Sequence, residues 1–436
     1  MFSRKDIIVL GMMIFALFLG AGNIIFPPME GFSSGQHWAS ASLGFVLTGV
    51  LMPFITLVVV AILGRGEELT KDLPKWAGTG FLVILYLTIG STFAMPRITN
   101  VAYEMAWLPL GLTENNANVR FVFSLIFNLI AMGFMISPNT IISSVGKFMT
   151  PALLVLLIAV AITVFISPLS EIQAPSNAYE NSHSLLIGLT SGYQTMDVLA
   201  AIAFGGIVAR ALSAKNVTKT KDIVKYTISA GFVSVILLAG LYFSLFYLGA
   251  TSAAVAEGAT NGGQIFSRYV NVLFGSAGTW IMAGIIVLAS LTTLVGVTSA
   301  SADYFSKFSV RFSYPFWAAL FTAMTITVSQ YGLTDLLRIT IPALLLIYPV
   351  AIVLVLLQFL RKKLPSIKFT YNSTLLVTVC FSLCDSLNNV KMLPESINSL
   401  LKHFPLSSEG MAWLVPTLVM LVASIFIGKA LHKTHS

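Results

Sequence analysis

The chain has 436 residues, of which 56% are hydrophobic and only 10% are charged. Soluble domains carry roughly 25% charged residues, so this composition excludes a soluble protein. The formal net charge of +8 indicates contact with anionic membrane lipid and no nucleic-acid partner, because Lys and Arg gather between apolar segments.

Twelve apolar runs of about 20 residues predict twelve membrane-spanning helices. The predicted segments are 7–29, 39–63, 79–106, 119–137, 147–167, 185–209, 223–249, 276–302, 314–331, 335–360, 371–391 and 411–431. The linkers between them are mostly short. The sequence therefore predicts one all-α transmembrane domain over residues 1–436.

The Lys and Arg residues predict the orientation of these segments. With the N-terminus inside and twelve crossings, nineteen of the 25 basic residues fall on the cytoplasmic side, Lys147 among them. The other six are Arg97, Arg120, Arg268, Arg338, Lys391 and Lys402. Because cytoplasmic loops accumulate Lys and Arg, this asymmetry predicts a multi-pass protein of the cytoplasmic membrane with both termini in the cytoplasm.

The first segment is interrupted at its centre by Ala16–Pro28, which reads A-L-F-L-G-A-G-N-I-I-F-P-P. Glycine weakens a helix and proline removes a backbone donor, so we expect the helix to unwind around Gly20, Ala21, Gly22 and Asn23. In hydrocarbon, a broken backbone is tolerated only where it faces protein or a water-filled cavity. Two half-helices that meet near the bilayer midplane form the solute site of many secondary transporters. The alternative is a close helix crossing through small residues.

The sixth segment carries a second interruption, Gly188–Asp197, which contains two glycines, several polar residues and a carboxylate. The fifth and tenth segments both begin with a basic residue, three further residues and P-A-L-L. Interruptions at matching places in two halves predict a five-plus-five inverted repeat. We expect repeat one over about 6–167, repeat two over about 185–362, and two peripheral helices over about 371–431.

The interruptions offer backbone groups that suit a zwitterion. Each break frees about four N–H and four C=O groups, and the N–H end of a half-helix is positive whereas the C=O end is negative. A carboxylate fits the donors after Gly22, an ammonium fits the freed carbonyls, and Asn23 adds an amide oxygen. The same carbonyls could instead hold a bare monovalent cation.

The eighth segment contains a cluster of neutral oxygens, Ala289-Ser-Leu-Thr292-Thr293. Hard cations prefer oxygen ligands, and without a carboxylate the cluster suits a singly charged ion. The alternative is that these hydroxyls bond only to their own helix, as Thr residues in membrane helices commonly do.

Three motifs resemble the branched-chain amino acid:cation symporter family, the BrnQ-type carriers. They are G-A-G-N-I-I-F-P-P in segment one, G-Y-Q-T-M-D-V-L-A in segment six and F-A-M-P-R at Phe93–Arg97 in segment three. The likeness covers essentially the whole chain, with Ser91-Thr92 standing where the family has a Pro-containing stretch. The residues of segment six that match the family pattern are Gly192, Tyr193, Thr195, Met196 and Asp197.

The resemblance implies a LeuT-type fold in which segments one and six hold the substrate. The residues implied for the substrate are Gly20, Ala21, Gly22, Asn23, Gly192, Tyr193, Thr195, Met196 and Asp197. The resemblance also implies a sodium ion between the first and eighth segments. Its implied ligands are the carbonyls of Ala16, Leu19 and Ala289 and the hydroxyls of Thr292 and Thr293.

Charged residues inside the membrane are functional candidates. Asp197 can serve as a proton or cation relay, as a partner of the substrate ammonium, or as a structural ligand of broken backbone. Arg97 can form a gate pair across the outer vestibule or have a structural or interfacial role. Asp385 and Lys391 lie near the outer end of segment eleven and are predicted to be peripheral.

The sequence favours a carrier over an enzyme or a channel. It contains no H-E-x-x-H, P-loop or paired-aspartate motif, and a channel would need a filter or a ring of charges. We therefore predict a non-enzymatic symporter without a cofactor or an obligate protein partner, which uses sodium or protons to import leucine, isoleucine and valine by alternating access. The alternative is a LeuT-type symporter for another small zwitterionic or organic solute.

Overall fold

The computed structural model describes residues 3–111, 113, 115–135, 150–176, 178–180, 183–308 and 311–433. These residues are predominantly helical and contain no β-strand. Lys147 and the first residues of the predicted segment 147–167 lie outside the described residues, as do the last two residues of segment 119–137.

The helices follow the predicted apolar segments in order along the chain. The α-helices are α1 (Arg4–Phe18), α2 (Ala21–Ser34), α3 (Trp38–Val46), α4 (Met52–Leu63), α5 (Lys75–Leu87), α6 (Ala94–Val101), α7 (Ala117–Met135), α9 (Thr150–Ile166), α10 (Ser184–Ser191), α11 (Asp197–Ser213), α12 (Thr220–Ala250), α13 (Ala253–Ala256), α14 (Gly262–Phe274), α15 (Ser276–Phe308), α16 (Tyr314–Val328), α17 (Leu333–Leu360), α18 (Ile367–Asn389), α19 (Glu395–Leu401) and α20 (Leu414–Lys433). Short 3₁₀ and π turns join several of them, namely η1 (Gly35–His37), η2 (Leu47–Leu51), η3 (Gly66–Thr70), η4 (Thr88–Thr92), η5 (Ala102–Trp107), η6 (Leu108–Leu110), η8 (Gly192–Thr195), η9 (Ser329–Tyr331) and η10 (Arg361–Lys363).

Seven helical stretches of the described chain are long and apolar enough to cross a membrane. They are Gly22–Leu63, Lys75–Leu110, Ala117–Met135, Thr220–Ala250, Ser276–Phe308, Leu333–Lys363 and Ile367–Asn389. The bent pair of α10 with α11 adds an eighth if it counts as one span, and Thr150–Ile166 and Leu414–Lys429 are apolar but shorter. These helices confirm a multi-pass membrane protein, whereas the total of twelve spans stays a prediction.

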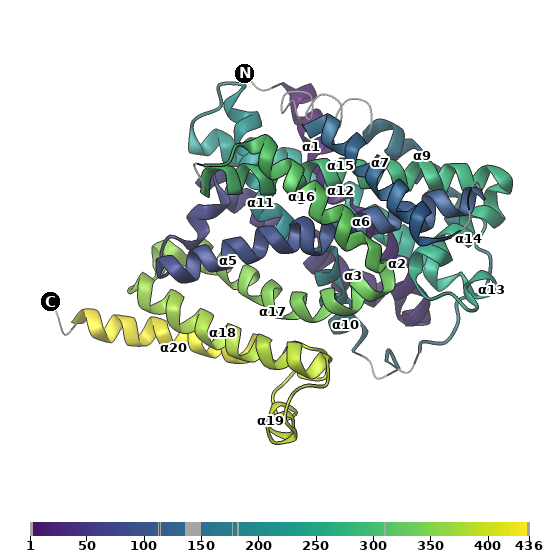
Figure 1. The fold of residues 1–436 in the computed structure, drawn as a ribbon. Helices are drawn as coiled ribbons and strands as arrows, with labels where there is room; N and C mark the ends of the chain where they lie inside the picture. Colours follow the sequence, from purple (N-terminus) through teal and green to yellow (C-terminus); the bar gives the residue numbers. More distant parts are fainter. Residues whose placement is uncertain are drawn as a thin grey trace.

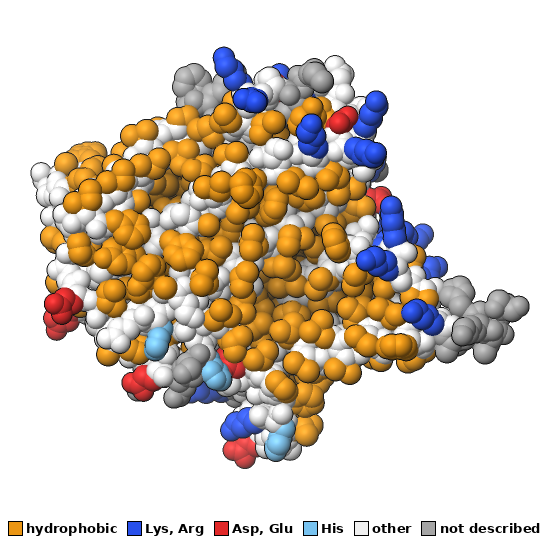
Figure 2. Space-filling model, turned by 180° about the vertical axis from the view of Figure 1, so that it is seen from behind, with side chains coloured by type: hydrophobic (Ala, Val, Ile, Leu, Met, Phe, Trp, Pro, Cys, Tyr) orange, Lys and Arg blue, Asp and Glu red, His pale blue; other side chains and the backbone are white. Residues whose placement is uncertain are grey.

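The outer surface is apolar over a broad area. Hydrophobic side chains cover most of the face seen in Figure 2, and Lys and Arg side chains gather along its right and upper edges. Exposed aliphatic and aromatic residues on the outer helices include Phe121 of α7, Val155 of α9 and Phe426 of α20. Such a contiguous apolar surface marks contact with a membrane or a partner, and the number of apolar helices favours the membrane.

The first predicted interruption is present but is narrower than predicted. Leu19 (φ −72°, ψ 82°) and Gly20 (φ −95°, ψ 177°) separate α1 from α2. Pro27 and Pro28 were expected to contribute to the break, yet both lie inside α2. The fixed φ of proline is compatible with a helix, so here each proline only leaves the carbonyl four residues earlier without its usual donor.

The sixth segment is also discontinuous, as predicted. After α10, the 3₁₀ turn η8 leads to Met196, whose φ of 64° is left-handed, and α11 then begins at Asp197. The two helices are bent by 47°. Residues other than glycine rarely adopt a positive φ because of steric strain, so Met196 marks the point where the helix breaks.

Gly188 was predicted to belong to this break, but it lies inside α10, where that helix crosses α3. A Cβ on Gly188 would lie 2.0 Å from the Ala41 carbonyl oxygen, and one on Gly44 would lie 2.0 Å from the Leu185 carbonyl oxygen. The two glycines therefore let the α3 and α10 backbones touch, which fixes the direction from which α10 approaches the break.

Gly188→Ala is expected to lower the free energy of unfolding by about 1–3 kcal/mol, because the added methyl group meets backbone that cannot rotate away. Gly240→Ala is the matched control, since a Cβ at Gly240 of α12 would have no neighbour within 4 Å. Thermal unfolding in detergent should show a lower midpoint for the first variant and an equal or higher midpoint for the second. Equal midpoints for both variants would contradict this packing.

The third segment, expected as one continuous helix over 79–106, is interrupted as well. Gly90 (φ −86°, ψ −137°) within η4 and Phe93 (φ −130°, ψ −58°) are non-helical. A new helix, α6, then starts at Ala94 with Pro96 in its first turn, where a proline removes no helical hydrogen bond. The sequence pattern did not indicate this break, and its consequence is that α6 begins close to the interruptions of segments one and six.

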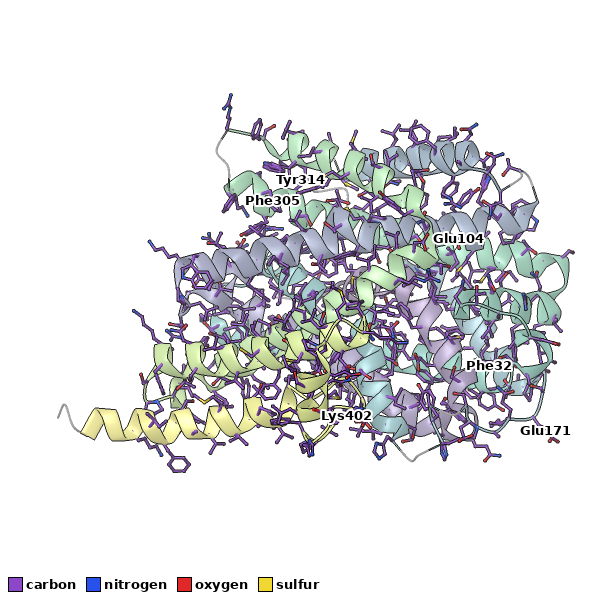
Figure 3. The ribbon with its side chains drawn as sticks, turned by 60° about the horizontal axis from the view of Figure 1, so that its bottom comes forward. Phe32, Glu104, Glu171, Phe305, Tyr314 and Lys402 are labelled. Atoms are coloured by element: carbon purple, nitrogen blue, oxygen red, sulfur yellow. The ribbon has the colours of Figure 1, made fainter. Side chains whose placement is uncertain are left out.

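The C-terminal helices lie at the edge of the molecule. Figures 1 and 3 both show α18 and α20 side by side, with α17 between them and the remaining helices. Asp385 and Lys391 were predicted to be peripheral because the last two segments lie outside the repeat. Asp385 of α18 is only 3% exposed, and Lys391 beyond the end of that helix is exposed.

Candidate functional site

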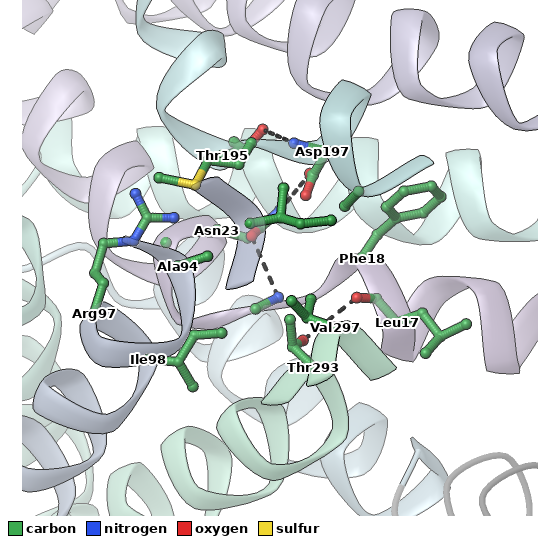
Figure 4. Close-up of a pocket in the computed structure, with 15 residues that line it drawn as sticks. Leu17, Phe18, Asn23, Ala94, Arg97, Ile98, Thr195, Asp197, Thr293 and Val297 are labelled. Atoms are coloured by element: carbon green, nitrogen blue, oxygen red, sulfur yellow. Dashed lines mark hydrogen bonds between the residues drawn. The ribbon is translucent and has the colours of Figure 1, made fainter. Parts of the chain in front are cut away.

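A buried cavity lies where the interrupted helices meet. About 20 Å³ of it is open to the centre of a water molecule, which is room for about one water. Its lining residues are Leu17, Phe18, Gly20, Gly22, Asn23, Ile89, Ala94, Arg97, Ile98, Thr195, Met196, Asp197, Ala200, Thr293 and Val297 (Figure 4). One side of this wall is apolar and the other carries an amide, a carboxylate and a guanidinium, as a site for a small amphipathic solute does.

Asn23 and Asp197 join the two broken helices. Asn23 Nδ2 donates to Asp197 Oδ2 at 2.7 Å, and Asn23 Oδ1 accepts from the Gly20 backbone N–H at 3.3 Å (Figure 4). Asn23 Nδ2 also contacts the Tyr242 hydroxyl. The Tyr242 hydroxyl lies 3.5 Å from Asp197 Oδ2. All of these side chains are buried, so the carboxylate at the start of α11 is held directly by the first turn of α2.

Thr195 completes the turn before Asp197. Its hydroxyl donates to the Gly192 carbonyl at 2.9 Å and lies 3.3 Å from the Asp197 backbone N–H. The η8 turn is supported further by Tyr193, whose ring stacks on Tyr348 of α17 with a centroid distance of 4.5 Å. These contacts fix the backbone of the second interruption.

The predicted cation ligands come together at the C-terminal end of α1. The Thr292 hydroxyl donates to the carbonyls of Ala16 at 3.1 Å and Ala289 at 2.9 Å, and the Thr293 hydroxyl donates to that of Leu19 at 3.1 Å. Because α1 ends at Phe18, the Ala16 and Leu19 carbonyls have no helical partner. The alternative of hydroxyls bonded only to their own helix is therefore wrong for both threonines.

These five residues supply only neutral oxygens, three from carbonyls and two from hydroxyls. Such a set fits a singly charged hard cation and lacks the carboxylates that a divalent ion favours. The C-terminal end of a helix adds a partial negative charge. Among the described residues, no group of three or more His, Cys, Asp or Glu could hold a metal ion.

Some predicted substrate residues lie beside the cavity and do not line it. Gly192 faces α3 and η2, where a Cβ would lie 2.0 Å from the Thr48 hydroxyl oxygen. Tyr193 lines a separate vestibule. The backbone of Ala21 begins α2, and its side chain is outside the described part of the chain. The remaining six predicted substrate residues line the cavity itself.

Arg97 was considered for a gate or a structural role, and the structure places it in the cavity wall beside Gly22. The sequence could not show this, because the position of Arg97 depends on the break at Gly90–Phe93. The apolar wall, formed by Ile89, Ala94 and Ile98 together with residues of α1, α11 and α15, was missed for the same reason.

A larger vestibule of about 600 Å³ lies on the other side of η8. Its wall includes Tyr193 and Gln194 of η8, and His183 Nδ1 and Glu409 Oε1 meet 2.5 Å apart within it. Although burial raises the pKa of Glu409, hydrogen bonds with His183 and Ser408 hold that pKa below its usual value. Because Thr195 of η8 lines the cavity and Tyr193 and Gln194 of η8 line the vestibule, this turn separates the two.

A helical bundle with interrupted helices around a buried, half-apolar cavity is characteristic of secondary transporters. The fold agrees with that of a solved nucleobase-cation-symport-1 family transporter in a closed conformation with bromovinylhydantoin bound. The TM-score is 0.64 at 12% identity, over 98% of this chain and 93% of that one. The described chain thus has the LeuT-type fold of this solved membrane transporter.

Residues 3–431 match the family described as branched-chain amino acid transport protein, and the chain belongs to this family. It is 34% identical to the branched-chain amino acid permease BrnQ of Escherichia coli strain K12, over 98% of this chain and 96% of that protein. It is 36% identical to the branched-chain amino acid transport system 3 carrier protein of Pseudomonas aeruginosa, over 98% and 97% of the two chains.

Proposed function

We propose that the protein is a cation-coupled symporter that imports leucine, isoleucine and valine across the cytoplasmic membrane by alternating access. The observation that carries this proposal is the cavity between the interruptions at Leu19–Gly20 and Met196, with apolar residues on one side and polar groups on the other. An aliphatic side chain fits the apolar wall, and the zwitterionic head fits the polar groups. The family and the names of its relatives favour branched-chain substrates.

Substrate binding requires the cavity to expand, because it has room for about one water molecule. Met196 has a flexible side chain in the wall and is a candidate for this movement. The interruptions also supply hinges, since a few non-helical residues can absorb large changes of φ and ψ. Expansion and closure of the cavity would then accompany transport.

Coupling to a monovalent cation, sodium being the first candidate, is supported by the oxygen cluster of Ala16, Leu19, Ala289, Thr292 and Thr293. The cluster touches the cavity directly, because Thr293 lines it. A cation here would attract the carbonyl end of α1 and would hold α1 against α15. This provides a physical route by which the ion favours one arrangement of the substrate site.

The ion pairs between elements favour a conformation closed toward the cytoplasm. Three of them connect separate elements on the side that the Lys and Arg pattern assigns to the cytoplasm: Asp6 with Lys215, Arg210 with Asp303, and Asp72 with Arg361. The vestibule with His183 and Glu409 lies on the side assigned to the exterior.

The proposed topology has both termini in the cytoplasm, with lipid around the apolar surface.

Uptake into proteoliposomes tests this proposal. Labelled leucine should accumulate and should be displaced by isoleucine and valine, because one apolar wall receives all three side chains. Parallel measurements with a sodium gradient and, in sodium-free buffer, with a fixed pH step identify the coupling ion. Uptake that is indifferent to all three amino acids but responds to another small zwitterion would support the alternative substrate class.

A further inference from the structure

The Arg97 guanidinium lies at the N-terminal end of α2, within the cavity. A Cβ on Gly22 would lie only 2.7 Å from Arg97 Nη2, so the guanidinium packs directly against the backbone of Gly22. The first backbone N–H groups of a helix have no helical acceptor and carry a partial positive charge. Two sources of positive potential thus converge on one side of the cavity.

The Arg97 side chain is only 3% exposed and is incompletely satisfied. Nη1 donates to the Gln194 carbonyl at 2.9 Å, Cζ lies 5.3 Å from the centre of the Phe26 ring, and Nε has no hydrogen-bond partner. No carboxylate among the described residues lies within 4.0 Å of the guanidinium. A buried guanidinium without an anion is costly, so an anionic ligand would be bound favourably.

Asp197 is the protein carboxylate that shares the cavity, but its position does not satisfy Arg97. Asp197 Oδ2 accepts the hydrogen bond from Asn23 Nδ2 at 2.7 Å. The two charges therefore line different parts of the same cavity and form no ion pair. Once the cavity expands, each of them can therefore face the opposite charge of a ligand whose polar head carries both an anion and a cation.

We propose that Arg97 binds the carboxylate of the transported amino acid, together with the backbone N–H groups at the start of α2. The ammonium group then faces the side of the cavity that contains Asp197. This inference rests on the proposed function and adds the residue that selects for a free α-carboxylate. Guanidinium forms charge-assisted bonds with a carboxylate, and a site built for such bonds discriminates strongly against a ligand without the anion.

Competition for binding of labelled leucine to the purified protein tests the proposal. In the wild-type protein, leucinamide, which lacks the anionic carboxylate, should bind at least about 30-fold more weakly than leucine. In Arg97→Gln, the affinity for leucine should fall by about 30-fold or more, while the affinity for leucinamide should change by less than about threefold. The leucine affinity of Arg97→Lys should lie between those of the wild type and Arg97→Gln, because lysine keeps the charge but not the planar fork.

Arg120→Gln is the matched control. Arg120 Nη1 also donates to a backbone carbonyl, that of Gln330 at 3.1 Å, its Cζ lies 5.8 Å from the Tyr103 ring centre, and its Nε lacks a partner. It does not line the cavity. Its substitution should therefore leave the ratio of leucine to leucinamide affinity unchanged.

Equal weakening of leucine and leucinamide in Arg97→Gln would assign Arg97 a structural role and overturn the proposal. Should that variant fail to fold, equal affinities of the two ligands for the wild-type protein would overturn it as well. If leucine, isoleucine and valine all fail to bind the wild-type protein, the proposed function is wrong. If they bind the wild-type protein and Arg97→Gln equally, only the role of Arg97 is rejected.

Discussion

Replacing both Thr292 and Thr293 by valine is expected to raise the cation concentration needed for half-maximal uptake by at least about tenfold. Valine keeps the shape of threonine and removes the oxygen, so the change deletes two of the five proposed ligands. Contributions of about 1 kcal/mol from each hydroxyl total about 2 kcal/mol, which is roughly 30-fold, so tenfold is the smallest change expected. The measurement is leucine uptake against sodium concentration, or against pH if protons prove to be the coupling ion.

Thr298→Val provides a control in the same helix. The Thr298 hydroxyl donates to the Leu294 carbonyl of its own helix at 2.7 Å, and it is not among the proposed ligands. This variant should keep the wild-type cation dependence. An unchanged cation dependence in the double variant would remove Thr292 and Thr293 from the ion site and leave them as hydrogen-bond donors that hold α15 against α1.

Asn23→Asp is expected to reduce uptake by at least about 100-fold. The substitution places a second carboxylate where Asn23 Nδ2 now lies 2.7 Å from Asp197 Oδ2. The carboxylate introduced at position 23 cannot donate as the amide does, and two carboxylates so close in a buried site repel each other. The lost hydrogen bond and the repulsion would move the first turn of α2 away from α11 and open the cavity wall.

The double variant Asn23→Asp with Asp197→Asn exchanges the two side chains and is expected to recover uptake to within about tenfold of the wild type. The amide placed at position 197 can donate to the carboxylate placed at position 23, and that carboxylate can still accept from the Gly20 backbone N–H. One carboxylate remains in the cavity. A double variant as inactive as Asn23→Asp would show that the charge must lie on α11, which is the requirement of a proton relay or of a fixed ammonium partner.

The two principal interruptions could be located from sequence because their causes are local. Gly20 weakens the helix at its own position, and the polar run before Asp197 is unusual within a membrane segment. The prolines were less informative, because Pro27 and Pro28 lie inside α2. Gly188 was assigned to the wrong feature, since a glycine in an unwound turn and a glycine in a helix crossing look alike in sequence.

The partners of each side chain required the folded chain. Asn23 and Asp197 are 174 residues apart in sequence, and Thr292 lies 276 residues beyond Ala16. The family resemblance implied that these residues share sites, but spacing along the chain could not specify which atoms meet. The break in segment three illustrates the limit most directly, because Arg97 reaches the cavity only through the irregular backbone of Gly90 and Phe93.

Sequence by itself thus determined the membrane class, the approximate helix positions and two of the breaks. These properties follow from composition and from residues within one or two helical turns, where the bilayer and the backbone impose the same rules on any chain. Only the tertiary structure decided which carbonyls receive the Thr292 and Thr293 hydroxyls, which amide holds Asp197 and where Arg97 points. Those contacts join distant segments, and their geometry depends on how the interrupted helices cross.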